Sequence, residues 1–233
     1  MAAHPTPLKF LMPGWFAVVM GLTGLALAWH RAVPAMGEMA GGVALVVAMA
    51  AAFVFAALAV FSFQRARRFP AAFREDFAHP VRHPFVAAIP ISLILLATAA
   101  VALAGATPAA AAAWWAGSLA QFLVTAWGVA KWWRGNQPGG LAWASLTPAL
   151  VIPVVGNVLA PLAGVPLGFT EWSAAQFAVG LFFWPLVQAL ILVRLATQGS
   201  WPERLQPAVF IFVAPPSVVG LAFAQFGAPA PLA

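Results

Sequence analysis

The stretch that decides the fold runs from Thr147 to Pro161 and reads TPALVIPVVGNVLAP. It is apolar enough to lie in a lipid bilayer, but three prolines, one glycine and one asparagine interrupt it. Each interior proline removes a backbone N–H donor and displaces the carbonyl one turn earlier. At membrane depth, unsatisfied backbone is tolerated only where other protein or a water-filled cavity accepts it. The stretch therefore predicts a broken membrane helix beside a transport pathway.

The composition is that of an integral membrane protein. The chain is 64% hydrophobic and 7% charged, whereas a soluble domain carries about a quarter charged residues. It has no cysteine, which excludes disulfides, thiolate metal sites and a cysteine nucleophile. The net charge of +6 comes from residues between apolar runs instead of one basic face, so we expect it to set membrane orientation and we expect no nucleic-acid partner.

Apolar runs long enough to cross about 30 Å of hydrocarbon predict an all-α integral membrane protein with a single transmembrane domain over residues 1–233. Seven spans are expected, at roughly 11–30, 41–64, 85–105, 110–133, 142–164, 172–196 and 207–228. If the N-terminus is cytoplasmic, ten of the eleven Lys and Arg residues fall on the cytoplasmic side and only Arg31 falls outside. This positive-inside distribution supports both the count and the direction, and so predicts a multi-pass membrane protein with a cytoplasmic N-terminus.

Prolines separate the odd spans from the even ones. Each of spans three, five and seven opens with a proline and is interrupted again one to two turns later, whereas spans two and four are proline-free and span six has only Pro185. A two-helix period is typical of tandem helical hairpins stacked around an axis. We expect the kinked odd helices to face the axis, although prolines are also common in membrane helices generally.

No Asp, Glu, Lys, Arg or His falls in the middle of any predicted span. Proton-coupled carriers, pumps and voltage sensors place ionisable groups there, and an intramembrane hydrolase needs a nucleophile with a base or metal ligands. The sequence therefore favours passive conduction, with no enzymatic activity and no cofactor. A retinal protein is excluded because the last span, 207–228, lacks a lysine for a Schiff base.

The kinked odd spans supply the candidate pathway residues, which are breaks, uncharged polar groups and phenylalanines able to narrow a pore. We expect the pore to be lined by Phe16, Gly21, Pro90, Ser92, Pro153, Gly156, Asn157, Phe212, Pro215, Pro216 and Ser217. Serines and threonines can instead bond back to their own helix. Helices broken at the prolines could also direct backbone N–H groups into the pore, where their partial positive charge favours anions.

The segment HPVRHP over residues 79–84 concentrates cationic groups before the third span. Two histidines four residues apart across prolines make a weak metal site, with no third ligand nearby. We expect His79, Arg82 and His83 to form a cationic vestibule that concentrates anions at the cytoplasmic mouth. The alternative is a basic interfacial loop that serves topology alone.

Four segments in register resemble the bacterial tellurite-resistance protein TehA and the plant slow-type anion channels. They are PGWF at 13–16 with LAW at 27–29, HPVR at 79–82, IPVVGN at 152–157, and VAPPS at 213–217 after Glu203-Arg204. The resemblance implies ten helices in five tandem hairpins, odd kinked helices around a central pore, and homotrimers. It also implies transport of small inorganic or organic anions such as chloride, nitrate, sulfite or dicarboxylates.

The chain departs from this pattern because it ends at Ala233, after the seventh span. The last three helices, including the one that bears the family's gating phenylalanine, are therefore expected to be missing. The chain is then either a fragment or truncated product, which we favour, or a divergent protein that closes its pore through partners. The leading hypothesis, by this resemblance, is an anion channel or facilitator of a bacterial inner membrane. The alternatives are a coupled carrier or exporter of dicarboxylate, sulfite or tellurite-related anions, and a non-conducting membrane protein.

Overall fold

The computed structural model describes residues 7–135, 137–138 and 140–227, and within these ranges every regular element is a helix. The long helices are α1 (Ala17–Arg31), α3 (Glu38–Arg68), α5 (Ala88–Ala104), α6 (Pro108–Trp133), α9 (Thr170–Gln198) and α10 (Ala214–Gln225). Two shorter helices, α2 (Val33–Met36) and α4 (Pro70–Ala78), lie at the two ends of α3. The predicted all-α class is confirmed.

Five helical stretches are long and apolar enough to cross a membrane, within the part of the chain that the structure describes. They are Glu38–Arg68, His83–Ala104, Pro108–Trp133, Thr170–Gln198 and Glu203–Gln225. The other two predicted spans are shorter. The first is α1, whose 15 residues follow a 3-10 turn, and the second is the apolar segment Pro148–Gly164.

The segment 148–164, hereafter the broken segment, is indeed not a smooth helix. It is a series of η5 (Pro148–Val151), α7 (Ile152–Val155), η6 (Gly156–Leu159) and α8 (Ala160–Gly164), alternating between 3-10 and α geometry. Pro148, Pro153 and Pro161 each stand at the first or second position of one of these pieces, where the missing N–H costs least.

The odd spans share one local design, which is a 3-10 turn that passes directly into an α-helix. The turn η2 (Pro13–Phe16) precedes α1, η3 (His83–Ala87) precedes α5, and η7 (Glu203–Val213) precedes α10. Prolines lie within the turns and near the start of α5 and α10. The proline repeat seen in the sequence therefore corresponds to a structural repeat.

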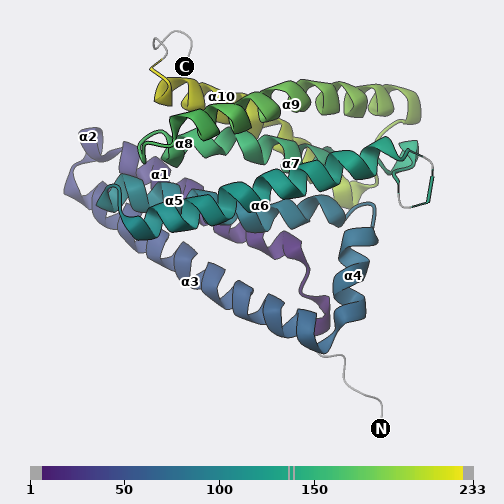
Figure 1. Cartoon of the computed structure of the whole chain (residues 1–233), viewed down its shortest axis with the longest axis horizontal. Helices are drawn as coiled ribbons and strands as arrows, with labels where there is room; N and C mark the ends of the chain where they lie inside the picture. The colour runs from purple at the N-terminus through teal and green to yellow at the C-terminus, as the bar shows by residue number, and fades with distance from the viewer. Residues whose placement is uncertain (1–6, 136, 139, 228–233) are drawn as a thin grey trace.

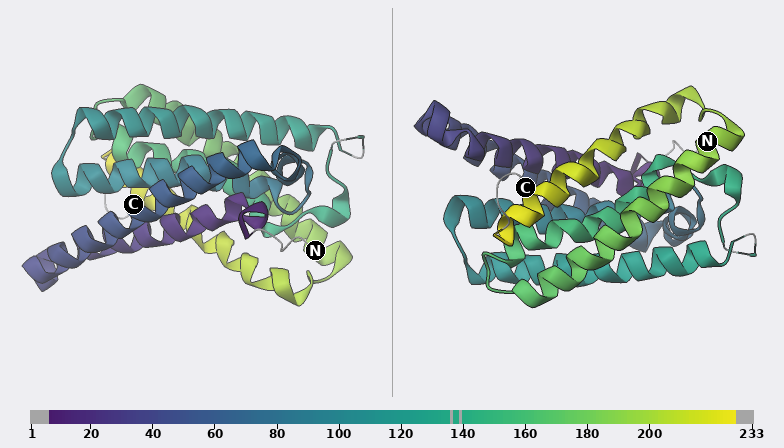
Figure 2. Two further views of the ribbon diagram at one scale, coloured as in Figure 1. Left: turned by 90° about the horizontal axis from the view of Figure 1, so that it is seen from below. Right: turned by 90° about the horizontal axis from the view of Figure 1, so that it is seen from above.

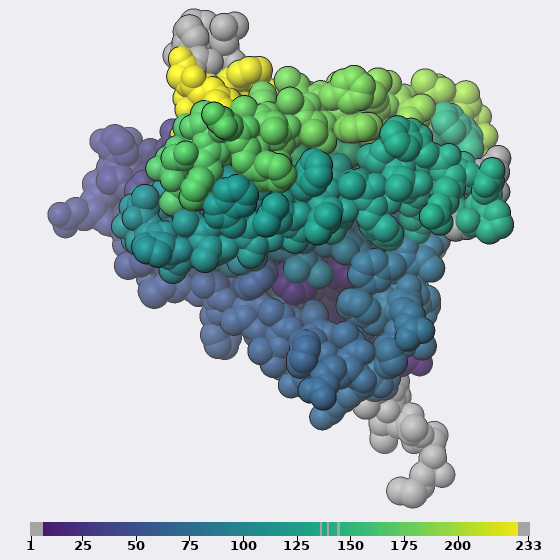
Figure 3. Space-filling model, in the orientation of Figure 1, coloured from purple at the N-terminus to yellow at the C-terminus, as the bar shows by residue number. Residues whose placement is uncertain are grey.

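The helices pair as hairpins, and the odd members meet one another. Helix α3 packs along α1, α6 along α5, and α9 along the broken segment (Figure 2). The odd members contact in the order α1, α5, broken segment, α10, while α6 and α9 cover one face with α3 running beside them (Figure 1, Figure 3). In the most apolar part of the 83–104 stretch 61% of residues are buried, against 11% for α3, so the third span is central and α3 is peripheral.

Candidate functional site

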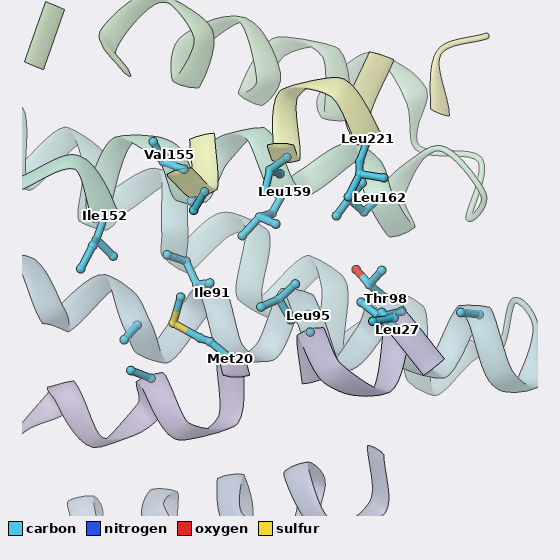
Figure 4. A pocket seen from close by; sticks show the side chains of 18 of the residues that line it. Met20, Leu27, Ile91, Leu95, Thr98, Ile152, Val155, Leu159, Leu162 and Leu221 are labelled. Atoms are coloured by element: carbon cyan, nitrogen blue, oxygen red, sulfur yellow. The ribbon is translucent and has the colours of Figure 1, made fainter. Parts of the chain in front are cut away.

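A cavity of about 700 Å³ lies between the odd members of the hairpins. Its walls come from α1, from η3 and α5, from the broken segment with the following turn, and from η7 and α10 (Figure 4). Helices α3, α6 and α9 contribute none of the lining residues. The expectation that odd helices face an axis thus has a direct geometric counterpart.

The cavity wall is almost entirely hydrocarbon. Along most of its length the side chains are aliphatic, contributed by Met20, Leu27, Ile91, Leu95, Ile152, Val155, Leu159, Leu162 and Leu221 (Figure 4). Thr98 lines it too, but its hydroxyl donates to the Ile94 carbonyl of its own helix, 2.9 Å away. The side chains that can carry charge, His30 and Arg31, lie at the end of α1. Such a wall has few groups that could replace the hydration water of an ion. It attracts an ion electrostatically only at the end where His30 and Arg31 lie.

The predicted pore residues fall on or just behind this wall. Gly156 lines the cavity. The others are not among its lining residues: Phe16, Pro90, Ser92, Pro153, Asn157 and Pro215 are buried in the packing behind it, Phe212 is half-buried, and Gly21, Pro216 and Ser217 are exposed. The immediate neighbours Ile91, Ile152 and Ala214 do line it. These three lining residues are each one position away from Pro90, Pro153 and Pro215.

The hydroxyl of Ser92 is occupied by contacts with two backbone carbonyls. Its Oγ lies 2.7 Å from the Ala88 carbonyl oxygen and 3.0 Å from that of Phe16. It therefore ties η2 to α5 instead of facing the cavity.

A polar network that the sequence analysis missed holds the break at Pro153. The Pro153 carbonyl accepts hydrogen bonds from Gln121 Nε2 at 2.7 Å and from Thr125 Oγ1 at 2.6 Å, both on α6. Asn157 Nδ2 also donates to Thr125 Oγ1 at 2.7 Å. The signal was present, because Gln121 and Thr125 are a polar pair four residues apart in an otherwise apolar helix and so share one face.

Close contacts at glycines bring even and odd members together. A Cβ on Gly156 would lie 2.4 Å from Gln121 Nε2 and 2.7 Å from Ile91 Cγ1, and one on Gly180 of α9 would lie 2.6 Å from Val158 Cγ1. A Cβ on Gly117 of α6 would lie 3.0 Å from the Pro90 carbonyl oxygen. Small residues at such contacts are how membrane helices approach closely without a hydrophobic driving force.

At the opposite end from Arg31, the predicted vestibule is an ion-pair cluster. Arg82 bonds Asp76 at 2.9 Å and also pairs with the exposed Glu75. Asp76 is fully buried and also forms an ion pair with Arg65. The Nε of Arg65 donates a hydrogen bond to the Lys9 carbonyl at 2.9 Å. Because both carboxylates of α4 are used in this way, Arg82 is not a free cation, and the vestibule prediction is corrected on this point.

The two histidines of this end act as structural acceptors or packing groups. His79 Nδ1 accepts from the Val81 and Arg82 backbone N–H groups, at 3.1 and 3.3 Å. Desolvation, followed by the nearby Arg82 charge, lowers the pKa of His79 from its usual value. His83 is fully buried, with its ring edge-to-face against Trp127. Neither ring supplies an exposed positive charge at neutral pH by this geometry.

Lys131 closes the same end of the bundle. Its Nζ donates to the carbonyls of Phe77 and Ala78 at 2.7 and 3.3 Å, which lie at the carboxyl end of α4, where a cation is favoured by the helix dipole. The described residues contain no group of three or more side chains suited to a metal ion.

The chain is similar in sequence to a described protein family and to several known proteins. Residues 11–233 match the family described as SLAC1, voltage-dependent anion channel. The S-type anion channel SLAH1 of Arabidopsis thaliana is 22% identical over 231 residues, covering 93% of this chain and 58% of that protein. The S-type anion channel SLAH2 of the same plant is 28% identical over 158 residues, covering 67% of this chain and 30% of that protein.

A bacterial relative is also similar. The tellurite resistance protein TehA homolog of Haemophilus influenzae is 26% identical over 198 residues, covering 83% of this chain and 57% of that protein. The chain therefore spans between 30% and 58% of the length of these three relatives. Their names are those of channels and a resistance protein, not of enzymes.

Proposed function

This chain belongs to the SLAC1 family of voltage-dependent anion channels, and we propose that it forms a passive pathway for small anions across a membrane. The cavity between the odd members of the hairpins is the pathway. The observation that carries the proposal is the make-up of its wall, which is aliphatic along its length and has no carboxylate among the lining residues that the structure describes.

The charges around the cavity indicate that the permeating ion is an anion. A carboxylate in a low-dielectric wall would repel anions over several ångströms, and the lining residues include none. The side chains of the lining that can be positively charged are His30 and Arg31. The field along the pathway therefore favours anions, although the attraction comes from one end of the cavity.

The same wall favours a channel over a coupled carrier. A carrier that couples anion movement to protons needs ionisable groups within the membrane, and the cavity is lined along most of its length by aliphatic side chains, with His30 and Arg31 at the end of α1 as its ionisable lining residues. We assign passive conduction for this reason, with neither a cofactor nor an enzymatic step.

We place the protein in a bacterial inner membrane with its N-terminus in the cytoplasm. In the predicted topology ten of the eleven Lys and Arg residues fall on one side, and three of them, Arg65, Arg82 and Lys131, converge on α4. The positive-inside rule then makes the α4 end cytoplasmic. By the family resemblance we further propose a homotrimer.

Reconstitution into planar bilayers tests the function. Under a potassium chloride gradient we expect the reversal potential to lie near the chloride equilibrium value and the current to be insensitive to a proton gradient. A reversal potential near the potassium value would overturn anion conduction. A current that saturates and follows the proton gradient would replace the channel with a carrier.

A further inference from the structure

The two ends of the cavity differ in chemistry. At the α4 end the lining residues are apolar, and they include Ala17, Phe85, Ile152 and Ile211. Figure 4 shows Leu27 beside Thr98 at the other end of the cavity from Ile152. Helix α1 continues beyond Leu27 to His30 and Arg31, both of which line the cavity.

The last turn of α10 adds a third polar group to this end. Gln225 lines the cavity one turn beyond Leu221, which Figure 4 places beside Leu162 at the same end as Leu27. Its amide makes no hydrogen bond within the described part of the chain. The mouth of the cavity near α2 therefore has a guanidinium, an imidazole and a primary amide, all of which can donate hydrogen bonds.

The charge of Arg31 is not compensated within residues 7–135, 137–138 and 140–227, because none of the ion pairs found there involves it. The carboxylates of this end of the bundle, Glu38 and Glu171, are exposed and lie outside the cavity lining. Arg82 at the opposite end is different, since it pairs with two carboxylates. Arg31 is exposed at this mouth, so an anion from solvent can reach its guanidinium, which has no carboxylate partner among the described residues.

We infer that Arg31, with His30 and Gln225, forms a binding site for a small monovalent inorganic anion such as nitrate or chloride at this mouth. The inference deepens the proposed function, because the site stands at one entrance of the proposed pathway. It moves the attracting charge away from the 79–83 segment, where the sequence had placed it. Arg31 supplies charge and N–H donors, and Gln225 supplies a neutral donor to the same ion.

Anion binding is tested on the purified full chain in detergent, separately from transport. Unfolding temperature is followed while sodium nitrate replaces sodium gluconate at constant ionic strength. We expect nitrate to stabilise the wild type and Arg31→Gln to weaken the apparent nitrate affinity about threefold to fivefold, because solvent partly screens an exposed ion pair. Arg31→Lys keeps the charge and should retain most of the affinity.

The matched control is Arg204→Gln, which removes an exposed arginine that does not line the cavity. We expect its nitrate response to equal that of the wild type. No nitrate response in the wild type, an unchanged response in Arg31→Gln, or an equal loss in Arg204→Gln would each overturn the site. Bilayer currents of the wild type decide conduction independently, so a wild type that binds nitrate without conducting would reject the pathway and keep the site.

Discussion

Helix α5 and the broken segment are both apolar, both contain prolines and both line the cavity, yet only α5 is continuous. In α5 the proline, Pro90, is the third residue, where the backbone N–H would have no partner in the helix. In the broken segment Pro153 and Pro161 are the second residues of α7 and α8, and each of these helices follows its own 3-10 piece. The repetition of such proline starts within one span, and not the presence of a single proline, distinguishes the broken segment from α5.

The two regions also differ in where their stability comes from. The hydroxyls of α5, Ser92 and Thr98, bond to carbonyls four residues earlier in the same helix, and Ser92 also contacts the Phe16 carbonyl of η2. The broken segment depends instead on α6, whose Gln121 and Thr125 donate to the Pro153 carbonyl. A break beside the cavity is thus maintained by a helix that does not line it, and substitutions can separate the two cases.

The largest expected effect is at Gly156, which lies between the cavity and this network. In Gly156→Ala the new Cβ would displace the Gln121 amide and Ile91. Overpacking costs about 1–3 kcal/mol and loss of the Gln121 hydrogen bond about 1 kcal/mol more. We expect the free energy of unfolding in mixed micelles to fall by about 2–4 kcal/mol.

The control for this variant is Gly21→Ala on α1, where nothing lies within 4 Å of the new Cβ. It should leave stability unchanged or raise it slightly, because alanine favours the helix by up to about 1 kcal/mol. Equal losses in the two variants would show that glycine matters here for a reason other than contact with α6.

The features that could be predicted from the sequence are those set by residues close together in the chain. The breaks at Pro153 and Pro161 and the alternation of odd and even spans follow from local backbone chemistry, so they were predictable. Which face of each kinked helix meets the cavity depends on packing between distant segments, and there Ile91 lines the wall in place of Pro90. The ion pairs of Arg82 were also beyond local prediction, because they form only when α4 folds back and brings its two carboxylates to the guanidinium.

A smaller effect is expected from the donor on α6. Gln121→Met keeps the length of the side chain but removes the hydrogen bond to the Pro153 carbonyl, which retains Thr125 as a partner. We expect a loss of about 1–2 kcal/mol in the free energy of unfolding, the usual contribution of one buried hydrogen bond.

Gln64→Met on α3 serves as the comparison, because that amide is half-buried and makes no hydrogen bond within the described residues. The free energy of unfolding of Gln64→Met should differ from that of the wild type by less than about 0.5 kcal/mol. If Gln121→Met were equally silent, the break at Pro153 would have to be stable without α6, and the contrast with α5 would lose its physical basis.

The smallest and most direct comparison uses two threonines with different partners. Thr125 Oγ1 contacts the Pro153 carbonyl at 2.6 Å and accepts from Asn157 Nδ2 at 2.7 Å, so Thr125→Val removes contacts between helices. Thr98 Oγ1 contacts only the Ile94 carbonyl of its own helix among the described groups, and that carbonyl keeps its backbone partner in Thr98→Val. We expect Thr125→Val to lower the free energy of unfolding by about 1 kcal/mol more than Thr98→Val does.

Both changes replace a hydroxyl with a methyl group at a buried helical position, so volume and helix propensity cancel between them. Chemical unfolding of the two variants in the same micelles measures the difference. A larger loss in Thr98→Val would mean that α5, and not the broken segment, relies on side-chain hydroxyls, and the comparison between the two regions would be reversed.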